Sequence, residues 1–92
     1  MIVEISVIPL GVMSLSKYIA QIIKILDEEN IKFEINPMGT IFVLSKFAEL
    51  GKILERIDDV LIKMGSIRNY YVIKIDTKND MDRRVKSVLK KL

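Results

Sequence analysis

Two glutamates occupy positions from which a carboxylate could bind a ligand. Glu4 and Glu34 each lie in a short segment in which apolar and polar residues alternate. This alternation is the period of a strand with one buried face, so both carboxylates would lie on the opposite face. A partly covered carboxylate is costly unless it is paired. Either the glutamates form ion pairs across strands with Lys32, Lys74 or Arg68, or they accept hydrogen bonds from a cationic or amidine-like small molecule.

The remaining candidates for chemistry are weaker. Hydroxyls such as those of Ser6 and Thr40 usually bond to nearby backbone groups. Tyr70 and Tyr71 could stack on a flat ring, although tyrosine on a strand more often packs against its neighbours. Residues 37–40, with the sequence PMGT, are in isolation a hairpin turn.

The composition argues against most enzymatic sites. The chain has no cysteine, which excludes disulfides, thiolate zinc sites and a cysteine nucleophile, and no histidine, the commonest general base near neutral pH. Asp76, Asp80 and Asp82 match no calcium-loop spacing, and Asp80 is suited to capping a helix. We therefore expect a binding protein and no enzyme, with no catalytic residue and no metal site.

Length and charge restrict the class of protein further. Ninety-two residues with a net charge of +3 are enough for one domain, which we place at residues 1–92. Residues 74–92 contain seven Lys or Arg and three Asp, a basic stretch that is either an anion-binding footprint or a solvated helix face.

No apolar run approaches the roughly 18 residues of a membrane span. We expect a cytoplasmic protein with no membrane partner, and the Lys- and Ile-rich composition is typical of a heat-adapted source.

Seven elements are predicted to position these side chains. Alternation and β-forming residues predict strands at 2–8, 31–36, 40–44 and 67–75, and apolar residues at helical spacing predict helices at about 16–28, 46–64 and 81–92. Pro9 and Gly11 should end the first strand. The predicted helix caps are Ser14 or Ser16, Ser45 and Asp80 at N-termini, with Asn30 and Gly65 in left-handed conformations at C-termini.

The element order β-α-β-β-α-β-α predicts an α+β, ferredoxin-like sandwich with an extra C-terminal helix. Two helices would cover one face of a four-stranded antiparallel sheet, leaving the other face open. Because that face is both apolar and charged, two copies of the chain stacked face to face would cover it. The residues predicted there are Ile2, Glu4, Ser6, Ile8, Lys32, Glu34, Asn36, Arg68, Tyr70, Val72, Lys74 and Asp76.

Five short segments, in order along nearly the whole chain, resemble the small thiamine-binding protein family. They are residues 8–11 (IPLG), 16–19 (SKYI), 37–40 (PMGT), 73–76 (IKID) and 85–88 (VKSV). Two segments depart from the family pattern. Residues 12–13 replace a glycine-containing loop, and residues 77–79 (TKN) stand where the family tends to carry arginines.

The resemblance implies a ferredoxin-like fold that assembles through sheet faces into a dimer of dimers. It also implies binding of thiamine, or of its hydroxymethylpyrimidine part, without turnover and with no other cofactor. Glu4 and Ser6 match the family's Glu-x-Ser on the first strand, Glu34 matches its acidic position before PMGT, and Thr40 matches the last residue of that motif. The full set of ligand-binding residues that the resemblance implies is Glu4, Ser6, Glu34, Asn36, Met38, Gly39 and Thr40.

Two other functions share this fold. One is a regulatory module that senses another small metabolite at a subunit interface. The other is RNA binding, which uses a basic residue, glycines and paired aromatics on a central strand. Residues 40–44 (TIFVL) lack that pattern, and a net charge of +3 is modest for the role, so we do not expect a nucleic-acid partner.

Overall fold

Seven elements follow one another in the computed structural model, which describes residues 1–78 and 80–92. Their order confirms the predicted α+β, ferredoxin-like fold with an additional C-terminal helix. Asn79, the last residue of the divergent segment 77–79, lies outside the described residues. The elements are β1 (Ile2–Leu10), α1 (Ser16–Glu28), β2 (Phe33–Asn36), β3 (Gly39–Val43), α2 (Phe47–Lys63), β4 (Arg68–Asp76) and α3 (Met81–Lys90).

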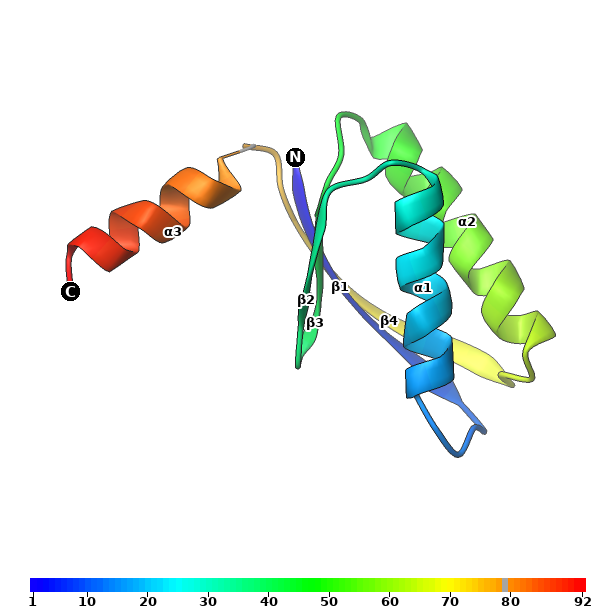
Figure 1. Ribbon diagram of the computed structural model, residues 1–92. Helices are drawn as coiled ribbons and strands as arrows, with labels where there is room; N and C mark the ends of the chain where they lie inside the picture. Colours follow the sequence, from blue (N-terminus) through cyan, green and yellow to red (C-terminus); the bar gives the residue numbers. More distant parts are fainter. Residues whose placement is uncertain (79) are drawn as a thin grey trace.

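The four strands form one antiparallel sheet in the order β2-β3-β1-β4. Helices α1 and α2 lie together on one side of this sheet, and α3 extends away on the other side (Figure 1). The sheet therefore has one face covered by α1 and α2 and one face without such cover, as predicted. We call the second the open face.

The hydrophobic core lies between the sheet and the two covering helices. The helical spacing of apolar residues explains why each helix buries one stripe. The buried stripe of α1 consists of Tyr18, Ile22, Ile25 and Leu26, whereas Ile19 is 38% exposed. The buried apolar residues are Met1, Val3, Ile5, Tyr18, Ile22, Ile25, Leu26, Phe42, Leu44, Leu50, Ile53, Ile57 and Leu61.

The first strand is longer than its sequence indicates. β1 continues through Pro9 to Leu10, where Leu10 pairs with Arg68 of β4. Pairing with β3 stops at Ile5, so the far half of β1 is bordered by β4 alone. A residue without an N–H group is tolerated in a strand that has a neighbour on one side only.

Two of the predicted N-caps are wrong. Leu15 holds the cap position of α1, and the hydroxyls of Ser14 and Ser16 lie 3.2 Å apart and bond to each other instead. Lys46, not Ser45, holds the cap position of α2. Neither cap residue makes a side-chain hydrogen bond to its helix, so packing of the apolar stripes stabilises these helices.

The other predicted helix ends are correct in position. Asn30 has φ 56° and Gly65 has φ 109°, the left-handed conformation that ends a helix. Asp80 holds the N-cap position of α3, but its carboxylate pairs with Arg84 and Lys78 rather than with the helix backbone.

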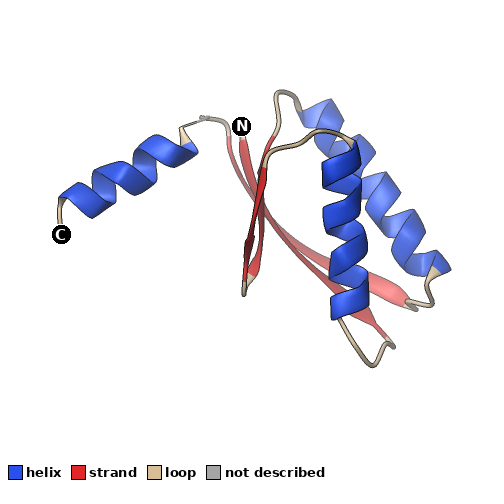
Figure 2. Cartoon of the chain, viewed as in Figure 1, coloured by secondary structure: helices blue, strands red, loops and turns tan. Residues whose placement is uncertain are grey.

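Helix α3 stands apart from the layered body of the chain (Figure 2). Two exposed ion pairs connect its first turns to the rest of the chain: Lys32, just before β2, with Asp82 at 2.8 Å, and Arg84 with Asp76 at the end of β4 at 2.9 Å. The apolar side chains that the structure describes here are at least 54% exposed; they are Val85, Val88 and Leu89, with Leu92 just beyond the helix. Among the described residues, no helix has the length and hydropathy needed to cross a bilayer.

Candidate functional site

The two glutamates lie in one row across the open face. Glu4 on β1 and Glu34 on β2 are both paired with Ile41 of β3, which lies between them. Glu4 is also paired with Lys74 on its other side. Because neighbouring strands are about 4.8 Å apart, the backbones of the two glutamates are roughly 10 Å apart.

The structure separates the two alternatives for these carboxylates. The Glu4 carboxylate forms an ion pair with the Lys74 ammonium at 3.1 Å, as the cross-strand reading predicts. Lys32 pairs with Asp82 instead of Glu34. Within residues 1–78 and 80–92, Glu34 forms no ion pair, and its side chain is exposed. Glu34 is therefore the carboxylate of this row that is open to a ligand.

A second row lies beside the first, at the β2–β3 hairpin. Asn36 pairs with Gly39, and the hydroxyl of Ser6 donates a hydrogen bond to the carbonyl oxygen of Met38 at 2.7 Å. A Cβ atom on Gly39 would lie 3.0 Å from the carbonyl oxygen of Ile5 and 3.1 Å from Ser6 Oγ. Gly39 therefore allows the hairpin to approach β1 closely, directly beside the glutamate row.

Thr40 points away from this surface. It is buried, pairs with Ile5 and Ile35, and contributes to the helix-covered side of the sheet. There it lines a cavity of about 450 Å³ beneath the hairpin, together with Ile19 and Ile22 of α1. Four more of the residues implied by the resemblance border this cavity: Ser6, Asn36, Met38 and Gly39.

The structure thus brings most of the predicted residues together. Five share the open face, Met38 is 86% exposed at the hairpin turn, and Thr40 alone is buried beneath the sheet. Their roles in binding remain predictions. The five on the open face are Glu4, Ser6, Glu34, Asn36 and Gly39.

Apolar side chains surround the polar rows of the open face. Ile8 is 41% exposed, Val72 47% and Tyr70 59%, and all three are on neighbouring strands. Tyr70 presents an aromatic ring on the same face, but it lies opposite Ile8, four residues along β1 from Glu4 and so roughly 13 Å away. A surface that combines exposed carboxylates with apolar neighbours can attract a flat, cationic ring.

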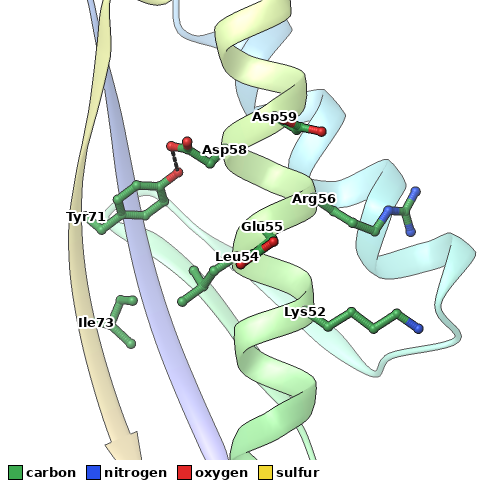
Figure 3. Close-up of a pocket in the computed structure, with 8 residues that line it drawn as sticks. All are labelled: Lys52, Leu54, Glu55, Arg56, Asp58, Asp59, Tyr71 and Ile73. Atoms are coloured by element: carbon green, nitrogen blue, oxygen red, sulfur yellow. Dashed lines mark hydrogen bonds between the residues drawn. The ribbon is translucent and has the colours of Figure 1, made fainter.

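A second group of polar residues, which we did not predict, lies between α2 and β4. Figure 3 shows Asp58 of α2 and Tyr71 of β4 pointing toward one another across a groove of about 710 Å³. Asp58 Oδ1 accepts hydrogen bonds from the Tyr71 hydroxyl at 2.7 Å and from Asn69 Nδ2 at 2.9 Å. Ser66 extends the network by donating to Asn69 Oδ1. The alternation of β4 could have placed Tyr71 on this side, but no local pattern points to Asp58.

The hydrogen bonds in this groove join α2 to β4. Hydrogen bonds from Asn69 and Tyr71 lower the pKa of the Asp58 carboxyl below its usual 3.8. Burial and the neighbouring Asp58 raise the pKa of the Tyr71 hydroxyl, which therefore remains a neutral donor. Lys52 and Arg56 line the same groove but point away from Tyr71 (Figure 3). The described residues contain no group of three or more acidic, His or Cys side chains able to hold a metal ion.

Comparison with known proteins gives consistent matches over almost the full length. A UPF0045 protein from Methanothermobacter thermautotrophicus is 36% identical over 95 residues, covering 97% of this chain and 96% of the relative. The crystal structure of a hypothetical protein from Methanocaldococcus jannascii superposes with a TM-score of 0.80 at 28% identity, covering 95% of this chain and 93% of that one.

A third match has the same fold at lower identity. It is a Thermotoga maritima protein provisionally described as a thiamine biosynthesis/salvage protein, with a TM-score of 0.79 at 22% identity and coverage of 95% and 96%. The model of the family described as "Thiamine-binding protein" matches residues 3–92. The chain therefore belongs to the thiamine-binding protein family.

Proposed function

We propose that this protein binds thiamine, or its hydroxymethylpyrimidine part, on the open face of the sheet without converting it. Membership of the family and the description of the Thermotoga maritima neighbour support a role related to thiamine. The observation that carries the proposal is the exposed carboxylate of Glu34, which has no ionic partner among the described residues and lies in one row with Glu4.

The chemistry of the ligand suits this row. An aminopyrimidine presents a ring nitrogen beside an exocyclic amine, and a carboxylate can pair with that edge through charge-assisted hydrogen bonds. Thiamine adds a thiazolium ring with a fixed positive charge, which an acidic surface attracts. Since Lys74 already neutralises Glu4, we assign the pairing role to Glu34 and a supporting role to Glu4.

A flat, exposed sheet cannot enclose a small molecule by itself. Ligand sites usually bury most of their ligand's surface, so the pocket needs a second wall. We propose that a second copy of the chain provides it, with open faces stacked into a dimer of dimers. The exposed apolar residues of the open face and of α3 support this arrangement, since monomers rarely expose large contiguous apolar surfaces.

Isothermal titration calorimetry with thiamine and with hydroxymethylpyrimidine tests the proposal. The wild-type chain should give saturable heat with at least one of the two ligands. Glu34→Gln should weaken binding by roughly tenfold or more, the loss expected of a charge-assisted hydrogen bond, while the mass in solution stays unchanged. Glu55→Gln, the same change on the exposed surface of α2, is the matched control and should bind normally.

Two results would contradict the proposal. The ligand would be wrong if the wild-type chain gave no heat with either compound at millimolar concentration. If Glu34→Gln instead broke up the oligomer, Glu34 would be an interface ion-pairing residue. A thermal-shift screen over other metabolites would then identify a different ligand, because any compound selective for the native state raises its stability.

A further inference from the structure

The two edges of the sheet differ in how far they are protected. β2 forms one edge with only four residues, and Pro37 follows it directly. β4 forms the other edge with nine residues, Arg68–Asp76. An edge strand exposes a row of unpaired backbone N–H and C=O groups, and native proteins usually shorten, bend or cover it.

Of the usual protective features, β4 carries charged residues, at Arg68, Lys74 and Asp76, but it is neither short nor bent. It contains no Pro or Gly, and its pairing with β1 continues without a bulge from Ile2–Asp76 to Leu10–Arg68. Between Arg68 and Lys74 it exposes two large side chains, Tyr70 at 59% and Val72 at 47%. A long, regular edge that exposes apolar residues is a template for another strand.

We propose that β4 pairs antiparallel with β4 of a second copy, with Val72 opposite Val72 of the partner. The chain itself is the partner because the strand is self-complementary in this register. Arg68 lies opposite the partner's Asp76, which also pairs with Arg84 of its own chain, so opposite charges face each other at both ends of the pair. Tyr70 lies opposite the partner's Lys74, which places an ammonium group beside an aromatic ring.

Other symmetric registers are less favourable. In an antiparallel pair of strands, residues opposite each other have their side chains on the same face of the sheet. Because neighbouring residues of one strand lie on opposite faces, a two-fold axis between two copies of β4 must pass through a residue position and not between two residues. An axis at residue 71 sets Arg68 against Lys74, and an axis at residue 74 sets Lys74 against itself, so both oppose like charges. Axes at residues 70 and 73 pair only five and seven residues of the strand. Only the axis at residue 72 pairs all nine and opposes unlike charges.

This contact is distinct from the stacking of open faces. The two-fold axis runs perpendicular to the sheet, so the two copies would share one eight-stranded sheet with both open faces on the same side. Ligand binding is not needed for it. The proposal therefore stands or falls separately from the proposed function.

Single-cysteine variants test the register directly because the chain has no natural cysteine. Opposed residues in antiparallel strands have Cα atoms about 4.5 to 5.5 Å apart, within the range that a disulfide spans. Val72→Cys should therefore form a covalent dimer on mild oxidation. Tyr70→Cys is the matched control: two copies of residue 70 would lie roughly 13 Å apart along the strands and should not crosslink.

Mixtures of two variants separate edge pairing from face stacking. Tyr70→Cys mixed with Lys74→Cys should crosslink only as the heterodimer. Asn69→Cys mixed with Ile75→Cys should do the same on the helix-covered side, which stacked open faces cannot bring together. Failure of Val72→Cys to crosslink would overturn the proposal. So would efficient crosslinking of Tyr70→Cys alone, or a Val72→Cys crosslink without either mixed pair.

Discussion

Asp58 accepts hydrogen bonds from Asn69 and Tyr71 and so connects α2 to the edge strand. Because these bonds hold the carboxyl pKa below 3.8, they stabilise the fold above that pH, and the contribution is lost as the pH falls through the lowered pKa. Asp58→Asn should lower the free energy of unfolding at pH 7 by about 0.5 kcal/mol, a small value because the site is solvent-exposed.

Urea unfolding from pH 7 to pH 2.5 measures this effect. The difference between wild type and Asp58→Asn should shrink on acidification below about pH 3.8. Asp59→Asn is the control, since that carboxylate has only a long ion pair with Lys63 at 3.9 Å. A difference that does not change with pH would show that the carboxylate charge is not responsible.

Gly39 shows how a single missing side chain positions the hairpin. Gly39→Ala would place a Cβ atom 3.0 Å from the carbonyl oxygen of Ile5, so the backbone of β1 must shift by a few tenths of an ångström. We expect a loss of about 1 to 3 kcal/mol in the free energy of unfolding, typical of overpacking. Gly51→Ala, where the added Cβ meets nothing within 4 Å in α2, should instead stabilise by about 0.5 to 1 kcal/mol. Equal effects of the two variants would refute this account.

At the scale of the residue, the sequence predicts which face of the sheet a side chain lies on better than it predicts which residue that side chain pairs with. Strict alternation was sufficient to place Glu4, Ser6 and Glu34 on one surface, because successive side chains of a strand point to opposite faces. It could not predict that Lys74 would pair with Glu4 while Lys32 turns to Asp82. Those choices depend on strand register and on the position of α3, which no local pattern encodes.

At the scale of the element, the number, type and order of helices and strands were predictable, but some of their ends were not. Hydrophobic periodicity identifies an element, whereas its last residues depend on pairing partners distant in sequence. β1 passes through Pro9 because β4 extends beside it to Leu10. Serine caps were predicted for α1 and α2, yet packing of the apolar stripes stabilises both helices without a side-chain cap.

Helix α3 supplies the test at this scale. A chain that ends at Lys78 should still fold and unfold cooperatively, because α3 is joined to the rest of the chain by exposed ion pairs, which contribute little to stability. Circular dichroism during urea unfolding measures this. Sedimentation should show that the shortened chain dissociates more readily on dilution, since it lacks the exposed apolar residues of α3. Loss of the folded sheet would contradict this view of α3.

At the scale of the whole molecule, the open face dominates. Ile41 lies between the two glutamates, so Ile41→Asp places a third acidic group in the row without entering the core. We expect stacking of the open faces to weaken by tenfold or more, measured by sedimentation, because like charges would meet in the interface. Ile62→Asp, at a 44% exposed position of α2, is the control and should leave assembly unchanged. Equal assembly of the two variants would contradict stacking through this face.

Methyl NMR during a titration with thiamine or hydroxymethylpyrimidine tests the central claim most directly. If either ligand binds between the glutamates, the methyl signals of Ile41 and Val72 should shift and saturate, while that of the core residue Ile57 should not. Ligand-induced shifts confined to Leu54 and Ile73, in the groove between α2 and β4, would place the site elsewhere and contradict the account.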